Sequence, residues 1–208
     1  MQVFYSDNSP YARIVRVAAR EARLHDRITW VRVRNRAPGS PLLAYSPVCR
    51  VPTLVEGDLV LGEARNICDY FGGVAGGTPL LPDESDWAAR GLESMMTGFL
   101  DGIAVWVREL RRSVPHRSDF LLDVEAKRAN RCLGHFEVTW KGLDGPPEWD
   151  FGHMALACAL DIADLNALMS GWPHEHPTLA SWFADRRTRP SMIATKPLQG
   201  AHDQTPLG

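Results

Sequence analysis

The spacing of hydrophobic residues changes along this chain and divides it into two parts. Up to about residue 75, short apolar runs that alternate with polar residues are separated by stretches of helical periodicity. This pattern predicts strands over residues 3–5, 28–33, 53–55 and 59–61 and helices over 10–22 and 63–71. The order βαβ, loop, ββα predicts an α/β domain with a four-stranded mixed sheet. The apolar stripe of the first helix leaves its arginines, Arg13 included, mostly on the solvent side.

Beyond a glycine-rich stretch at residues 72–79, which we interpret as a linker, only helical periodicity remains. Helices are predicted over residues 86–112, 119–141, 150–168 and 177–187, with a short one after Pro190. Such a run of helices indicates an all-α helical bundle. The sequence therefore predicts two domains, residues 1–75 and 84–208, with a loose polar tail after Pro197.

Composition argues against several classes of function. The 208 residues are 45% hydrophobic and carry a net charge of −2, so no general basic field favours nucleic acid. No uncharged apolar run of about 18 residues occurs, so we expect no membrane span, and the first residues do not resemble a signal peptide. The four cysteines form no CxxC pair and no Cys/His cluster, which favours reduced thiols in the cytoplasm and no metal site.

One stretch of sequence predicts a binding site for a small acidic peptide. Pro52 stands at the mouth of a predicted strand, so we expect either a cis Val51–Pro52 bond or a strand that begins there. A cis bond would turn the N–H and C=O of Val51 outward, where they can pair with an extended peptide. Eleven residues after the proline, Glu63 opens a helix whose free N–H groups and dipole suit a carboxylate.

Several motifs, taken in order, resemble the soluble glutathione S-transferases of the bacterial type. They are Tyr5-Ser6 with Ser9-Pro10-Tyr11-Ala12-Arg13, Ser46-Pro47-Val48-Cys49-Arg50-Val51-Pro52, Gly62-Glu63-Ala64-Arg65, residues 154–160, and residues 177–182 running to Arg189-Pro190-Ser191. The resemblance covers nearly the whole chain. It implies a thioredoxin-like N-terminal domain, an all-helical C-terminal domain, a homodimer, and glutathione as the co-substrate.

The resemblance also implies a role for each part of the peptide site. Val51 would pair its backbone with the cysteinyl part of glutathione beside cis-Pro52. Glu63 and Ala64 would hold the γ-glutamyl end, and Arg50 would lie near the glycine end.

The group that activates the thiol would lie in the turn that contains Asn8 and Ser9. A thiol is mostly protonated near pH 7, and a donor aimed at the sulfur beside a helix N-terminus favours the thiolate. Ser9 is placed for that role and can cap the helix at the same time, while Asn8 is the rival donor. Tyr11 and Trp106 are candidates for the second-substrate pocket, with packing in the core as the alternative for both.

The sequence departs from the family pattern in three places. Ala64 replaces a Ser whose hydroxyl meets the γ-glutamyl carboxylate, a hydrogen bond worth about 0.5–1.5 kcal/mol. Cys49 replaces a Gly and is interpreted as a small apolar filler, with a mixed disulfide as the alternative. In the helix predicted from Asp150, His153 stands where the usual capping box has Asp, so Asp150 can cap but His153 cannot return the carboxylate bond. The other three cysteines are expected in the core.

These observations favour an enzyme that transfers glutathione to an electrophilic, mainly apolar small molecule. Two alternatives stay open. A glutathione-dependent thiol reductase or peroxidase would depend on Cys49, because Ser9 stands where such an enzyme would have a cysteine. A non-catalytic module for protein association is suggested by Ala64.

Overall fold

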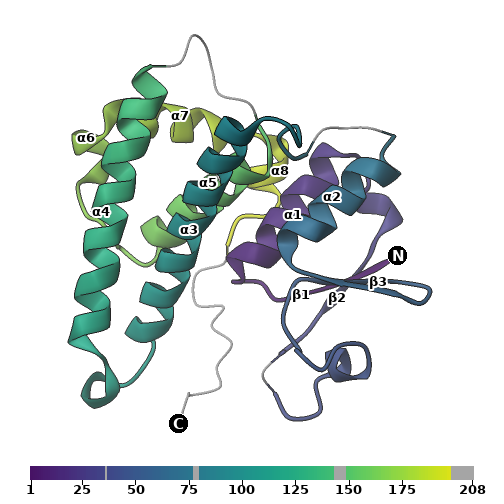
Figure 1. The fold of residues 1–208 in the computed structure, drawn as a ribbon. Coiled ribbons are helices and arrows are strands. Elements are labelled where there is room, and N and C mark those ends of the chain that lie inside the picture. Colours follow the sequence, from purple (N-terminus) through teal and green to yellow (C-terminus); the bar gives the residue numbers. More distant parts are fainter. Residues whose placement is uncertain (36, 77–79, 143–148, 198–208) are drawn as a thin grey trace.

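The computed structural model describes residues 1–35, 37–76, 80–142 and 149–197, and it begins with an α/β unit (Figure 1). Its elements are β1 (Gln2–Tyr5), α1 (Pro10–Glu21), β2 (Thr29–Arg32), β3 (Thr53–Glu56), β4 (Leu59–Gly62) and α2 (Ala64–Val74). The strands lie in the order β2-β1-β3-β4, with β1 parallel to β2 and antiparallel to β3, and β3 antiparallel to β4. The predicted four-stranded mixed sheet is therefore confirmed.

The two faces of the sheet are covered differently. Helices α1 and α2 lie over one face, where Val3 and Leu54 enter the main hydrophobic core (Figure 1). The next residue on each strand points to the other face, as the two-residue period of a strand requires. There Phe4 and Val55 form a smaller cluster with Leu42, which comes from the segment between β2 and β3.

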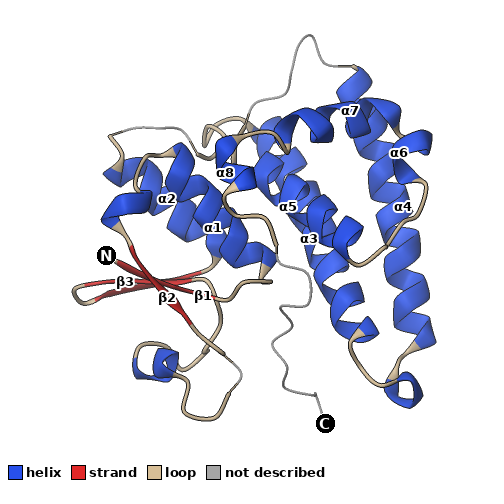
Figure 2. Cartoon of the chain, turned by 180° about the vertical axis from the view of Figure 1, so that it is seen from behind, coloured by secondary structure: helices blue, strands red, loops and turns tan. Residues whose placement is uncertain are grey.

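The second part of the chain is helical, as predicted (Figure 2). It contains α3 (Trp87–Leu110), α4 (Asp119–Lys141), α5 (Phe151–Leu165), α6 (Trp172–Glu175), α7 (Pro177–Arg186) and α8 (Pro190–Ile193), and the chain also has short 3₁₀ turns at His25–Arg27, Pro41–Ala44 and Val114–His116. Every residue of α5 from Phe151 to Ala163 is buried. Helix α3 packs against both α4 and α5, and α1 also packs against α5. Helix α5 therefore joins the two parts of the molecule.

Two glycines allow the helices to approach closely. A Cβ atom at Gly152 of α5 would lie 2.5 Å from Met96 Cε and 3.0 Å from Glu93 Cα, both on α3. At Gly102 of α3 it would lie 2.7 Å from a carboxylate oxygen of Glu125 on α4. A larger residue at either position would require the end of the Met96 or Glu125 side chain to shift, and at Gly152 the backbone of Glu93 is also close, so α3 runs near both of its partners.

The start of α5 uses a different capping arrangement from the one in the family pattern. Asp150 caps the helix, because its Oδ1 accepts from the backbone N–H of His153 at 3.0 Å. The imidazole Nδ1 of His153 lies 2.7 Å from the same oxygen. The predicted cap is confirmed, and the histidine bonds the capping carboxylate itself.

Some predicted boundaries were wrong. Helix α2 continues through Gly72 and Gly73 to Val74, although these glycines were assigned to the linker, and α5 ends at Leu165 and not at residue 168. The short helix α6 was missed, and it begins with Pro173 in its first turn. Part of the predicted linker, residues 77–79, and the predicted tail lie outside the described residues.

The prediction that Arg13 lies on the solvent side was also wrong. This side chain is 1% exposed, and its Nη2 lies 2.6 Å from Oδ2 of Asp161 on α5. A charged residue can occupy a buried face when a carboxylate from a distant part of the chain pairs with it.

Candidate functional site

The turn after β1 places Ser9 at the N-terminus of α1. The backbone N–H of Ser9 donates to the Ser6 carbonyl at 3.3 Å, and the Ser9 Oγ accepts from the Ala12 N–H at 3.2 Å. An ion pair between Asp7 and Arg32 of β2 holds the turn to the sheet. Ser9 therefore caps the helix, and its hydroxyl hydrogen remains able to donate to a ligand.

The loop before β3 lies beside this turn. The Val51–Pro52 bond is cis, Pro52 is buried, and Arg50 is exposed. Thr53 pairs with Phe4 in the antiparallel register, so Pro52 stands level with Tyr5, at the end of β1 that leads into the Ser9 turn.

The N-terminus of α2 completes the same edge of the sheet. Thr53 also pairs with Gly62, so Glu63 stands level with Pro52. Glu63 is exposed, has φ 61°, and makes no side-chain hydrogen bond to cap α2. Non-glycine residues held in this region of φ are concentrated at functional sites. Its carboxylate and the first-turn N–H groups that follow it can serve a ligand.

Cys49 has a structural role next to the cis Val51–Pro52 loop. Its φ is 48°, a conformation that favours glycine, in agreement with the Gly that the family pattern has at this position. Its Sγ lies 3.0 Å from the Asn35 carbonyl, and the Asn35 side-chain amide donates to the Cys49 carbonyl at 3.3 Å. This pair of bonds and its packing against the smaller core cluster agree with the interpretation of Cys49 as a filler.

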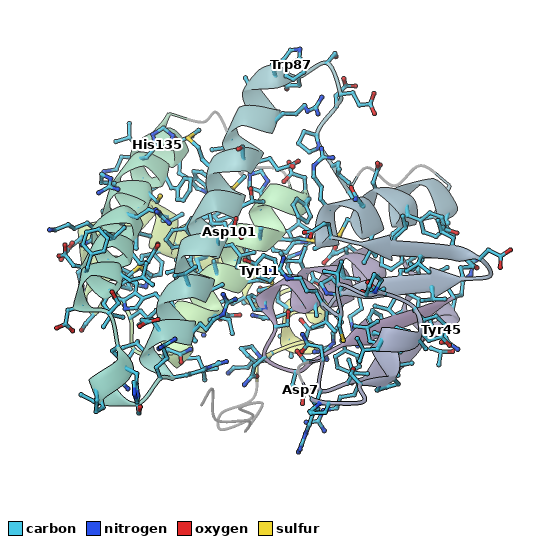
Figure 3. All side chains as sticks on the ribbon, turned by 60° about the horizontal axis from the view of Figure 1, so that its bottom comes forward. Asp7, Tyr11, Tyr45, Trp87, Asp101 and His135 are labelled. Atoms are coloured by element: carbon cyan, nitrogen blue, oxygen red, sulfur yellow. The ribbon has the colours of Figure 1, made fainter. Side chains whose placement is uncertain are left out.

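Tyr11 connects α1 to the helical part. Its Oη donates to Oδ1 of Asp101 on α3 at 2.5 Å, and Figure 3 shows the two side chains where these helices meet. Burial and the hydrogen bond to Asp101 raise the pKa of Tyr11, while the charges of Arg108 and Arg50 oppose the rise. The hydroxyl therefore stays protonated near neutral pH.

Trp106 lies elsewhere on α3. Five residues at 3.6 per turn place it about 140° around the helix from Asp101. Its half-buried side chain packs against the main core. The structure thus brings Tyr11 together with Asp101, and it does not bring Trp106 to the same face.

A cavity of about 450 Å³ lies between α3 and α4. Asp101, Arg131, Cys132, His135 and Phe136 contribute to its lining. Of the three cysteines expected in the core, Cys68 and Cys158 are buried there, and Cys132 is half-buried and packs against the main core beside this cavity. The pKa of the Cys132 thiol is raised by burial, which disfavours the thiolate.

Sequence reasoning missed Asp101, Arg108 and Asn35 as neighbours of the site. No local motif marks these residues, and they reach the site only through the packing of α3 and of the loop after β2. Across the described ranges no group of three or more His, Cys, Asp and Glu side chains is placed to hold a metal ion. None of the helices described is long and apolar enough to cross a membrane.

Comparison with known proteins agrees with the predicted family and fold. Residues 8–73 match the model of the glutathione S-transferase N-terminal domain. The chain resembles the crystal structure of a glutathione S-transferase from Methylobacillus flagellatus KT with GSH bound, at 25% identity and a TM-score of 0.83, covering 95% of this chain and 99% of that one. Residues 8–73 thus carry the N-terminal domain of the glutathione S-transferase family, and the chain shares the fold of solved members of that family over nearly its whole length.

Other glutathione S-transferase relatives support the assignment. An uncharacterized GST-like protein of Escherichia coli (strain K12), YibF, is 26% identical over 160 residues, which cover 74% of this chain and 78% of that protein. A glutathione transferase family member from Pseudomonas fluorescens Pf-5, solved with bound glutathione, is 27% identical with a TM-score of 0.77 and covers 95% of this chain and 98% of that one. The predicted family and fold class are confirmed.

Proposed function

We propose that this glutathione S-transferase conjugates glutathione to an electrophilic, mainly apolar small molecule. The observation that carries the proposal is the meeting of three segments at one edge of the sheet: the Ser9 turn, the cis Val51–Pro52 loop and the start of α2 at Glu63. Solved relatives with GSH or glutathione bound support the choice of co-substrate.

Each segment would hold one part of glutathione. The backbone of Val51 pairs with the cysteinyl residue, Glu63 and the N–H of Ala64 take the γ-glutamyl end, and Arg50 takes the glycine carboxylate. The Ser9 hydroxyl, already oriented by its cap, donates to the sulfur. A donated hydrogen bond and the positive end of the α1 dipole both favour the thiolate and lower the pKa of the bound thiol. Asn8, next to Ser9 in the turn, is the second candidate donor.

The test is calorimetric binding of glutathione followed by steady-state conjugation of 1-chloro-2,4-dinitrobenzene and other aryl and alkyl electrophiles. Ser9→Gly removes the hydroxyl while costing the helix cap only a few tenths of a kcal/mol. We expect glutathione to bind both proteins, and the thiol pKa of the complex, followed by thiolate absorbance, to rise by about one unit in the variant, with about a tenfold loss of kcat below that pKa. Asn8→Ala, measured in the same way, shows whether the neighbour shares the role.

Ala64 favours one alternative, a non-catalytic module for protein association. That function predicts negligible glutathione affinity in the wild type and no turnover with any electrophile. The thiol reductase or peroxidase alternative has less support, because the Cys49 thiol is half-buried and bonded to the Asn35 carbonyl. A missing Cys49 adduct in the mass spectrum after treatment with oxidised glutathione would exclude it.

The proposals for cellular location and oligomeric state come from the same family relationship. We propose a cytoplasmic homodimer that detoxifies electrophiles. All four cysteines are free thiols, as suits a reducing compartment. Sedimentation equilibrium at micromolar concentration tests the dimer.

A further inference from the structure

Two positive charges lie near the hydroxyl of Tyr11. Arg50 stands directly before Val51, and Arg108 lies on α3, and both side chains are exposed. Both lower the pKa of Tyr11 against the effect of burial, with Arg108 the stronger of the two. Within the described ranges, neither guanidinium forms an ion pair with a carboxylate.

The position of Arg108 follows from helix geometry. It comes seven residues after Asp101, so two turns of α3 place both on one face, about 10 Å apart along the axis. Ala104 and Val105 lie between them on that face, and both are half-buried. Because Tyr11 bonds Asp101 and stands two residues after Ser9, this face begins close to the proposed position of the sulfur.

The carboxylates of this region already have hydrogen-bond or ion-pair partners, whereas Arg108 has no carboxylate partner among the described residues. Asp101 accepts the hydroxyl of Tyr11. The neighbouring carboxylate Glu109 accepts from the backbone N–H of Ser118 at 2.7 Å and lies 3.7 Å from Arg112. If Arg50 takes the glycine carboxylate of glutathione, Arg108 is the cation left for a second anionic group.

We propose that the second substrate carries a carboxylate beside an apolar electrophilic body, and that Arg108 determines this specificity. The apolar body lies along Ala104, Val105 and the ring of Tyr11, and the carboxylate ends at Arg108. This inference rests on the proposed conjugation of glutathione and adds the class of its second substrate.

The probes are 4-chloro-3-nitrobenzoate and its neutral amide, 4-chloro-3-nitrobenzamide. In each reaction the glutathione thiolate forms a sulfur–carbon bond at the chlorinated carbon, and the carbon–chlorine bond breaks. Chloride leaves with the bonding electrons, and the thiol proton passes to solvent. Each kcat/KM is divided by the uncatalysed rate constant of the same probe, so that intrinsic reactivity cancels.

In the wild type we expect this ratio to be at least about tenfold higher for the benzoate than for the benzamide. In Arg108→Gln the preference should fall by about a factor of ten, and Arg108→Lys should keep part of it. Arg90→Gln, at a half-buried arginine near the other end of α3, is the control and should keep the full preference. The preference should shrink as salt rises from about 0.05 to 0.5 M, because an exposed charge pair is screened.

Three outcomes would overturn the assignment: equal ratios in the wild type, an equal loss for both probes in Arg108→Gln, or a rise in the KM of glutathione as the main effect of that variant. Calorimetry with the two finished glutathione conjugates measures the same preference without turnover. A protein that binds the benzoate conjugate at least about tenfold more tightly through Arg108 but turns over neither probe refutes the proposed catalysis and keeps the anionic site.

Discussion

At the scale of single residues, Ala64 is where this site differs most from the family pattern. It is the first residue of α2 and directly follows Glu63, which has a φ of 61°. An alanine keeps the N–H donor but has no hydroxyl for the γ-glutamyl carboxylate. Ala64→Ser should therefore tighten glutathione binding by about 0.5–1.5 kcal/mol, which is roughly 2–10-fold in Kd by calorimetry.

Ala88→Ser, which adds a hydroxyl in the first turn of α3 at an exposed position, is the control and should leave the Kd unchanged. If Ala64→Ser binds no more tightly than the wild type, then the γ-glutamyl end does not lie at this helix N-terminus.

The residues of the candidate site differ in how far the sequence predicts them. The cis Val51–Pro52 bond and the Ser9 cap follow from local motifs, because proline and a helix-capping serine act on their immediate neighbours. Asp101 reaches Tyr11 from 90 positions away, and no local pattern indicates such a contact. The buried Arg13 was misplaced for the same reason, since its carboxylate partner Asp161 lies on another helix.

At the scale of elements, α7 is held by a carboxylate from another helix. Its N-cap residue makes no side-chain capping bond. In its place the buried Glu137 of α4 accepts from the N–H groups of Thr178 at 3.1 Å and Leu179 at 2.8 Å, and Lys141 lies 3.0 Å away. Burial alone would raise the pKa of Glu137, but these donors outweigh it and lower the pKa to about 2.

Glu137→Gln should therefore lower the free energy of unfolding by about 2 kcal/mol at pH 7, because charged hydrogen bonds to two backbone donors are weakened. A depressed folded-state pKa contributes stability above the unfolded value near 4.5, and this is lost as pH falls through about 2. The difference in the free energy of unfolding between the wild type and Glu137→Gln, measured by urea denaturation, should accordingly shrink between pH 5 and pH 2.

The exposed Glu175→Gln variant on α6 is the control, with an expected change within about 0.5 kcal/mol. A destabilisation by Glu137→Gln that stays constant down to pH 2 would mean that the carboxylate charge is not what holds α7.

Long elements of the fold were predicted well and short ones were not. Helices α3, α4 and α5 carry several turns of apolar periodicity, so their type follows from the sequence and only the ends shift. The four residues of α6 complete one turn, too few for a period to be recognised. In α2, the tertiary position of Phe71 in the core carries the helix past Gly72 and Gly73, against their low propensity.

At the scale of the whole molecule, the two parts meet through buried charges between α1 and α5. Arg13 and Asp161 have side-chain exposures of 2% and 5% and lie 2.6 Å apart. Arg13 also donates to the Met192 carbonyl at 3.3 Å, which connects α1 to α8, and Arg187 lies 3.0 Å from the other oxygen of Asp161. One buried pair thus joins three helices from distant parts of the chain.

Breaking this pair from one side should be costly. Arg13→Met leaves a buried carboxylate with a single, partly exposed partner and should lower the free energy of unfolding by about 3–5 kcal/mol, measured by urea denaturation. The double variant Arg13→Met with Asp161→Leu removes both charges and should recover more than half of that loss. Arg189→Met breaks the more exposed pair with Glu21, at exposures of 32% and 18%, and should cost only about 1 kcal/mol. Asp161→Leu alone completes the comparison. If the loss of stability in the double variant equals the sum of the losses in Arg13→Met and Asp161→Leu, the two charges act independently, and apolar packing of α1 against α5 is what joins the two parts.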